Sequence, residues 1–373
     1  MTKRTRSSLA IVAAAISACS LLSIATLEGC TIVNGLVADR PDTGVGKIPD
    51  AGTDADADAG PIANGCAVVP GRPAVPDDGT LEIVAVAKKM YLTPQVGAAP
   101  VGYDLDESCL LPSSDTCKSP KPVADDPGGL DNRGAQLFAL VNDRTDLEDR
   151  ANEGIIAGKN GFLFKVAKYN GKSDDYQVEV SIYSALGLLD GGTNVKPDFK
   201  ETETWTIDEG QFNEFGLPKL LVDGWVVGGK VYAVIGQDAA LRLSNTFSVQ
   251  LSGGVLRLDL DLTGAKPAIR GGVVAGRWTA RDMIATVSRQ RLSDASASAI
   301  CAPGQELILL AAKGQICDNV DIMGDRKVDK TGANCDATSV AFAFEAGPAA
   351  LGPKMAFTPE DDCPGFDAGA CEK

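Results

Sequence analysis

Apolar and polar side chains alternate along several short segments after residue 80, and this pattern predicts β-strands. The alternation runs through residues 81–87 and 162–167, and it is clearest in residues 176–182, where valine and isoleucine alternate with glutamine, glutamate and serine. Successive side chains of a strand point to opposite faces of a sheet, so each segment has one apolar face. A polar opposite face is typical of an antiparallel sheet with one side in water.

A hairpin centred on Gly253-Gly254 is the strongest local prediction. Residues 245–252 and 255–262 both alternate, and they flank a glycine pair suited to a two-residue turn. With that turn, phenylalanine, valine and leucine of the first segment face leucines of the second, so one face is wholly apolar. A shift of one residue would remove this match. We therefore expect the two segments to pair with each other.

Helical patterns are fewer than strand patterns. Thr145 and Glu148 have the spacing of a capping box, and Gly158 is placed to end the helix that follows. A second helix is predicted to begin near Thr279, and a third to run from about residue 303 to 313.

These elements together predict a mainly β fold. Many short strands with glycine-rich turns favour an antiparallel β-sandwich, jelly-roll-like, with a small disulfide-braced helical subregion near residues 279–335. We expect this domain to span residues 81–356 and to be followed by an acidic, cysteine-containing tail at 357–373. Residues 30–80 are rich in Asp, Ala, Gly and Pro, a composition that predicts an acidic disordered linker.

The first 29 residues have the layout of a signal peptide. A basic start precedes an apolar run from residue 9 to 27, which ends in Leu27-Glu28-Gly29-Cys30. This box predicts a lipoprotein signal peptide at 1–29 and acylation of Cys30. Three alternatives stay open: cleavage at a second box before Cys19, an ordinary secretory signal, or an uncleaved membrane span.

Cysteine parity supports the box at Cys30. The chain has ten cysteines, and removal of Cys19 with acylation of Cys30 leaves an even number to pair in an exported protein. The spacing makes Cys301–Cys317 a plausible pair and would let Cys363 and Cys371 close a small loop, but the connectivity of the eight cysteines stays open. Cys66 is expected to fasten the linker to the domain. The expected location is extracytoplasmic, with a lipid anchor in the outer membrane or at the cell surface of a Gram-negative bacterium.

Charge and histidine content exclude several function classes. The formal net charge is −15, which repels nucleic acid. The chain contains no histidine, so Ser-His-Asp, Cys-His and HExxH catalytic systems are ruled out. No catalytic residue is assigned, and an enzyme is not the favoured interpretation. Classes that use paired carboxylates or a lysine or tyrosine base stay open.

Residues 102–134 are the best candidate site because they concentrate carboxylates in an irregular, cysteine-containing stretch. Calcium binds six to eight oxygen ligands from flexible loops of this kind. The alternative is a solvated loop whose acids face water and cap turns. A second acidic run at residues 318–329 fails the calcium-loop spacing and is expected to be solvated. The candidate calcium ligands are Asp104, Asp106, Asp125, Asp126, Asp131 and Asn132.

The same stretch resembles a family of secreted lipoproteins found in myxobacteria. The similarity runs from about residue 81 to 356, and the resemblance implies export and lipidation but no activity, so no functional residue comes with it. The residues that carry it are GYDLD at 102–106, Cys109, GGLDN at 128–132, residues 152–161 and CDATSV at 335–340.

Function is therefore expected to be binding rather than catalysis. The favoured interpretation is a membrane-anchored binding or adhesion module for an extracellular polysaccharide or surface protein. Tyr103, Trp205 and Trp225 are candidates for stacking on sugar rings, although aromatic residues more often pack in a core. The alternatives are a structural surface protein without a small ligand, or a carboxylate-based glycan-active enzyme using acids near Asp208 and Glu209. No cofactor other than calcium is expected.

Overall fold

The computed structural model describes residues 62–371 except 64, 77, 96–97, 110–115, 123–124, 237–238, 244–246, 294–297 and 359–362. The expected signal peptide, Cys30 and the first half of the expected linker lie outside the described residues. Among the described helices, none has the length and apolar character needed to cross a membrane.

Eight antiparallel strands form one sheet that closes into a barrel. Each strand pairs with the next of these eight, and the last pairs with the first, which is an up-and-down arrangement. The predicted mainly β, antiparallel fold is confirmed, but a closed barrel replaces the expected two-sheet sandwich. In order, the strands are β3 (Leu81–Tyr91), β4 (Gly161–Tyr169), β5 (Asp175–Asp190), β8 (Leu221–Val227), β9 (Lys230–Ile235), β12 (Gly254–Asp261), β13 (Ala268–Thr279) and β14 (Ala337–Pro348).

Shorter strands add to the barrel. Beyond its pairing with β8, β5 pairs with β7 (Thr204–Asp208), which in turn pairs in parallel with β15 (Ala350–Met355). The two-residue strand β6 (Thr193–Asn194) pairs with the end of β5. Outside the barrel sheet, β1 (Ile62–Ala63) and β2 (Cys66–Ala67) form a two-stranded sheet of their own. A separate hairpin joins β10 (Ala239–Arg242) to β11 (Ser248–Leu251).

The predicted hairpin around Gly253-Gly254 is wrong. The first segment, β11, pairs with β10, and the second, β12, pairs with β9 and β13. At the glycine pair the chain runs against β13: the amide of Ser252 donates to the carbonyl of Arg277 at 2.8 Å. A Cβ on Gly254 would lie 2.1 Å from the Ala275 carbonyl oxygen. Glycine is thus required here for close backbone approach and not for a two-residue turn.

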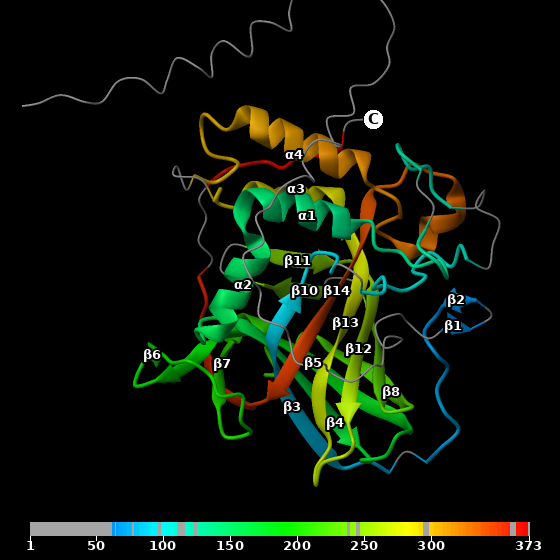
Figure 1. Cartoon of the computed structure of the whole chain (residues 1–373), viewed down its shortest axis with the longest axis vertical. Coiled ribbons are helices and arrows are strands. Elements are labelled where there is room, and N and C mark those ends of the chain that lie inside the picture. The colour runs from blue at the N-terminus through cyan, green and yellow to red at the C-terminus, as the bar shows by residue number, and fades with distance from the viewer. Residues whose placement is uncertain are drawn as a thin grey trace, which may run out of the picture. The chain divides into compact units, whose positions relative to one another are not determined.

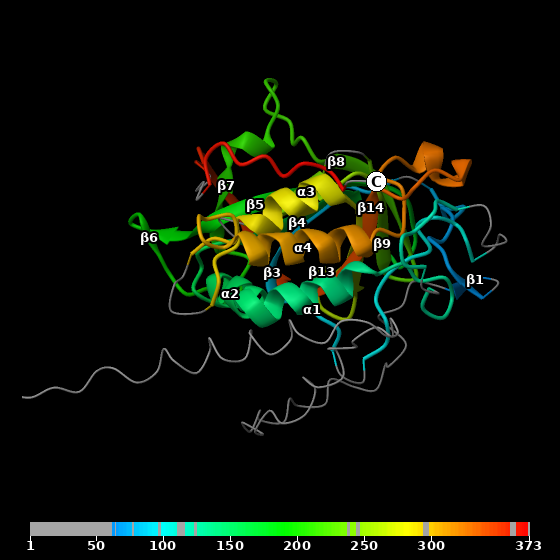
Figure 2. The ribbon, with the colours of Figure 1, turned by 90° about the horizontal axis from the view of Figure 1, so that it is seen from above.

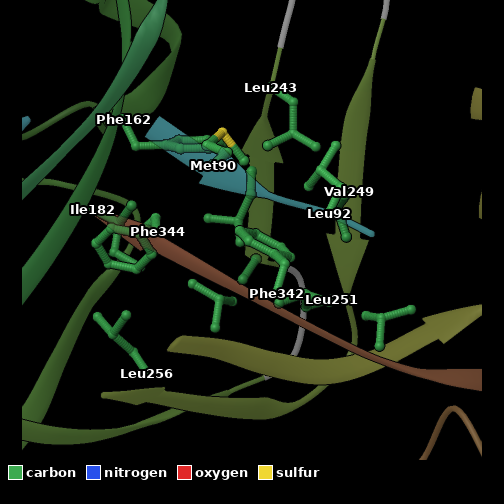
Figure 3. Close-up of a cluster of buried hydrophobic side chains, with 14 of the residues drawn as sticks. Met90, Leu92, Phe162, Ile182, Leu243, Val249, Leu251, Leu256, Phe342 and Phe344 are labelled. Atoms are coloured by element: carbon green, nitrogen blue, oxygen red, sulfur yellow. The ribbon is translucent and has the colours of Figure 1, made fainter. Parts of the chain in front are cut away.

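The barrel interior is filled by the apolar faces predicted from the alternation. The inward side chains of β3, β4 and β5 belong to one buried cluster, in which Phe164 stacks on Phe344 at 4.5 Å between ring centroids. The β10–β11 hairpin adds Val249 and Leu251 to the same cluster (Figure 3). The predicted faces are therefore confirmed even where the predicted strand partner is not.

Helices cover one end of the barrel (Figures 1 and 2). They are α1 (Gly134–Thr145), α2 (Leu147–Ile156), α3 (Ala280–Ser288) and α4 (Glu306–Asp318), with 3-10 turns at Glu209–Gln211 and Arg326–Thr331. The start predicted at Thr279 is confirmed, since its side chain accepts a hydrogen bond from the Asp282 amide.

The other helix predictions are partly wrong. Thr145 ends α1, a helix that the sequence pattern did not predict, and it does not cap α2. The Glu148 carboxylate instead accepts hydrogen bonds from the amides of Leu92 and Thr93 and so fastens α2 to the end of β3. Helix α4 starts later than predicted and continues through Gly314.

All eight cysteines from Cys66 onward form disulfides, as parity predicted. The bonds are Cys66–Cys109, Cys117–Cys335, Cys301–Cys363 and Cys317–Cys371. The pairs that spacing made plausible, Cys301–Cys317 and Cys363–Cys371, are wrong, because each end of the α4 segment is joined to the C-terminal tail instead. Four disulfides indicate an oxidising, extracytoplasmic compartment.

Part of the expected linker packs on the barrel. Ala67 is fully buried, and the Trp225 indole nitrogen donates a hydrogen bond to the Pro70 carbonyl at 2.9 Å. The Arg72 guanidinium lies 5.1 Å from the centre of the Trp225 ring. The prolines of this stretch thus accompany an ordered path along β8, where composition alone predicted disorder.

Candidate functional site

Three of the six predicted calcium ligands converge at one point. Carboxylate oxygens of Asp104, Asp106 and Asp131 all lie within 4.8 Å of one another. Their exposed fractions are only 8%, 8% and 4%. The Asp-x-Asp and Asp-Asn motifs therefore did indicate carboxylates that come together. They lie in two loops more than twenty residues apart in the chain.

A backbone hydrogen bond joins the two acidic loops, and a disulfide joins the first loop to β2. The Asp131 amide donates to the Tyr103 carbonyl at 3.0 Å, and the Asp104 amide donates to the Ala67 carbonyl at 2.9 Å. The Cys66–Cys109 bond fixes the far end of the first loop. The backbone that carries the cluster is thus cross-linked to β2 and bonded between the two loops.

The three carboxylates differ in their hydrogen bonding. Asp131 accepts from the amides of Leu105 at 2.6 Å and Asp106 at 3.2 Å, and Asp106 accepts from the Ser108 amide at 2.8 Å. Neither oxygen of Asp104 makes a hydrogen bond to the described residues, although both oxygens are buried. A buried carboxylate without a partner is costly, so this side chain requires a physical explanation.

Burial and mutual repulsion perturb the cluster. Burial, and then the charge of Asp106, raises the pKa of Asp104 to about 6, although the nearby backbone amides of Cys109 and Ser108 act in the opposite direction. Burial, followed by the charges of Asp106, Asp321 and Asp125, raises the pKa of Asp131 well above its usual range. Two unit charges 4.8 Å apart repel by on the order of 3 kcal/mol at an effective dielectric constant of about 20. A bound proton or a bound cation would each relieve this repulsion.

The other predicted ligands lie outside the convergence point. Asp125 is exposed at the rim, where it accepts a hydrogen bond from the Ser108 hydroxyl at 3.0 Å. Asp126 is also exposed and pairs through its backbone with Leu130. Asn132 uses its amide group to bind backbone, donating to the Val101 carbonyl at 2.9 Å and accepting from the Ala341 amide at 2.8 Å. It therefore fastens the loop to β14.

The acidic run at residues 318–329 is not a solvated loop, contrary to expectation. Asp321 accepts hydrogen bonds from the amide and hydroxyl of Ser339, and burial raises its pKa to about 6. Asp329 is 4% exposed and forms an ion pair with Arg277 at 2.6 Å. The local spacing carried no signal for either contact, since the partners lie 18 and 52 residues away in the chain.

Arg277 connects this region to the acidic cluster. It is 2% exposed, and besides Asp329 its guanidinium donates to the carbonyls of Leu105 at 2.5 Å and Met323 at 2.9 Å. Since Leu105 lies between Asp104 and Asp106, Arg277 positions both carboxylates through the backbone. Sequence reasoning missed this residue because an arginine in a strand gives no sign of burial.

A pocket of about 450 Å³ adjoins the cluster. Charged and amide-bearing side chains line it alongside apolar surface, and the Cys117–Cys335 disulfide contributes Cys117 to its wall. Acceptors and donors are therefore both available to a hydroxyl-rich ligand. Its charged and amide-bearing side chains are Asp106, Asp125, Asp126, Asp321, Lys118, Lys121, Arg133, Asn132 and Gln136. Of these, Asn132 and Asp321 already bind protein groups and Lys121 pairs with Asp318.

A neighbouring pocket of about 500 Å³ over β3, β13 and β14 is less suited to a polar ligand. Its Glu345 accepts a hydrogen bond from Tyr91 and pairs with Lys88, and its Arg270 pairs with Asp261. The acidic pocket is the stronger candidate because it adjoins the buried carboxylate cluster.

The aromatic residues predicted to stack on sugars are buried. Tyr103 and Trp205 are 1% and 0% exposed, and both pack in clusters on the outside of the barrel wall. Trp225 is 9% exposed and is covered by Arg72. None of the three offers a face to a sugar ring, so core packing, the alternative interpretation, applies.

Asp208 and Glu209 lie in different environments. Asp208 forms an ion pair with Arg242 and accepts a hydrogen bond from the Gly210 amide at 2.9 Å. Glu209 is exposed in the following 3-10 turn. The turn chemistry around Gly210 therefore explains these acids.

Comparison with known proteins adds no assignment. No protein-family model, curated protein or solved structure matches this chain. The resemblance to myxobacterial lipoproteins stays an expectation, and the chemistry of the acidic pocket has to be argued from its own geometry.

Proposed function

We propose that this chain is an exported, lipid-anchored binding module that recognises an extracellular polysaccharide at the acidic pocket. The observation that carries the proposal is a pocket of about 450 Å³ whose lining includes carboxylates, lysines, an arginine and a glutamine. Carboxylates accept hydrogen bonds from sugar hydroxyls, and the cationic and amide groups donate to sugar oxygens. Recognition would therefore depend on hydrogen bonds and not on aromatic stacking.

The disulfides and the N-terminal sequence support export and tethering. Four disulfides are stable in an oxidising compartment, and the Leu27-Glu28-Gly29-Cys30 box supplies the attachment point. A single acyl chain binds membranes weakly, whereas two or more anchor stably, as a lipoprotein cysteine would. Intact mass of the mature protein tests this: acylated Cys30 is expected as the first residue, and an unmodified Cys30 contradicts it.

Polysaccharide binding is tested with pocket variants. The purified protein is incubated with immobilised envelope and matrix polysaccharides, and Gln136→Ala and Lys118→Ala are expected to weaken retention at least fivefold. Lys172→Ala is the matched control, because Lys172 is exposed in the turn between β4 and β5. Absence of wild-type binding, or equal retention of pocket and control variants, contradicts the proposal. Release of sugar products in the same incubations would instead favour a glycan-active enzyme.

A further inference from the structure

We propose that Asp104, Asp106 and Asp131 form a calcium-binding site that fastens the two acidic loops to each other. The inference goes beyond polysaccharide recognition and does not depend on it. A failed polysaccharide screen would leave it standing, because its test uses the metal alone.

The Asp104 side chain is the observation that separates this site from an ordinary acidic surface. The residue is 8% exposed, and neither of its oxygens has a hydrogen-bond partner among the described residues. One of these oxygens lies within 4.8 Å of oxygens from both Asp106 and Asp131. The unpartnered group therefore points to where the other two carboxylates converge, and a cation at that point would satisfy it.

The donor atoms select a hard cation. Cys66 and Cys109 lie close to Asp104, but both sulfurs are used in a disulfide and cannot act as thiolate ligands. The chain has no histidine, so imidazole ligands are absent as well. Oxygen-only donor sets suit calcium, magnesium and manganese, whereas zinc and copper prefer sites that include nitrogen or sulfur ligands.

Size and coordination number favour calcium among the hard cations. Calcium–oxygen bonds are about 2.3–2.6 Å long, so oxygens on opposite sides of one ion lie up to about 5 Å apart. The spread of the three carboxylates fits within that span. Calcium accepts bidentate carboxylates and water, and the adjoining pocket gives water a path to the ion. Magnesium demands strict octahedral geometry and gives up its waters reluctantly.

The site joins segments that are distant in the chain. Asp104 and Asp106 belong to the loop closed by Cys66–Cys109. Asp131 lies three residues before the start of α1 at Gly134. A shared ion would bind the two loops together beside the polysaccharide pocket, to which Asp106 belongs. Calcium would thereby stabilise the wall of that pocket as well as the domain.

Calorimetric titration and melting curves test the proposal on the mature, disulfide-intact protein after EDTA treatment. Wild type is expected to bind one Ca²⁺ with a Kd on the order of 10⁻⁴ M or tighter and to melt several degrees higher at 5 mM CaCl₂. Asp104→Asn should weaken binding at least tenfold and lose the calcium-induced shift. Its melting temperature without metal should equal or exceed that of wild type, because a repulsive charge is removed.

Asp143→Asn is the matched control, since Asp143 is exposed on α1 and carries the same charge change. It should bind calcium as wild type does. No heat and no melting shift in wild type, or unchanged affinity in Asp104→Asn, would overturn the site. Binding of Mg²⁺ as tight as that of Ca²⁺ would overturn its assignment to calcium.

Discussion

Replacement of Arg277 by alanine should destabilise the domain far more than replacement of Arg270 on the same strand. Arg277 is 2% exposed and holds Asp329 together with two backbone carbonyls, whereas the Arg270 side chain is 66% exposed in its pair with Asp261. Both changes remove one positive charge from β13. Only the change at Arg277 leaves a buried carboxylate, that of Asp329, without its partner.

The expected magnitudes follow from that difference. Breaking a buried ion pair from one side costs about 3–5 kcal/mol, because the remaining Asp329 charge stays out of water. Loss of an exposed pair costs less than about 1 kcal/mol. For a folded region of this size, about 4 kcal/mol corresponds to a fall in melting temperature of roughly 10 °C.

Chemical and thermal denaturation at pH 7 with disulfides intact measure both effects. The double variant Arg277→Met/Asp329→Leu should recover most of the lost stability, because it removes the buried charge along with its partner. Since Arg277 also binds the Leu105 carbonyl, the single variant should weaken calcium binding too. If Arg277→Ala costs no more than Arg270→Ala, the assignment of Arg277 as a buried positioning residue is refuted.

Two further predictions concern pH and close packing. The raised pKa values of Asp104 and Asp321, about 6 against an ordinary 3.8, mean that the folded state binds more protons than the unfolded state between about pH 4 and 6. The metal-free protein should therefore gain about 1 kcal/mol of stability per group when the pH falls from 7 to 5, as measured by melting in EDTA. Asp321→Asn should reduce this gain. A loss of stability over the same pH range would contradict the prediction. Gly254→Ala should lower the free energy of unfolding by more than about 2 kcal/mol, because the new Cβ would lie 2.1 Å from the Ala275 carbonyl oxygen. Gly236→Ala should be nearly neutral, because no atom lies within 4 Å of the new Cβ. Equal costs would contradict the close approach of Gly254 to β13.

The sequence predicted those features that depend on residues close together in the chain or on composition. The inward faces of β3, β4 and β5 follow from a two-residue period, and the cap at Thr279 needs only Asp282 three residues later. The parity of the cysteines likewise follows from counting. Each of these predictions depends on residues within one element or on composition.

Long-range pairing was not predictable by the same means. The Gly253-Gly254 pair suits a tight turn as well as the close approach of two backbones. Only the position of β13 decides between these two roles. Barrel closure depends on β14 meeting β3, which lies at the other end of the folded chain. Disulfide partners are similarly set by where the tail lies on α4, which spacing does not reveal.

In the candidate site too, the sequence predicted residues that are close together in the chain and missed those that come from distant segments. Asp104, Asp106 and Asp131 were found because Asp-x-Asp and Asp-Asn concentrate oxygen donors in loops. Asp126 and Asn132 share that composition but face water or bind backbone, and Asp125 sits at the rim, where it binds the Ser108 hydroxyl. The residues that make the cluster unusual, Asp321 and Arg277, reach it from distant strands and loops. Sequence therefore identified the kind of chemistry, and the fold determined which side chains take part.

A crystal structure grown with calcium, with anomalous diffraction to identify the ion, tests the central claim most directly. One ion is predicted, within about 2.3–2.6 Å of carboxylate oxygens from Asp104, Asp106 and Asp131. A cluster that stays empty at millimolar calcium, with Asp104 hydrogen-bonded to a neighbouring carboxyl group, would contradict the account.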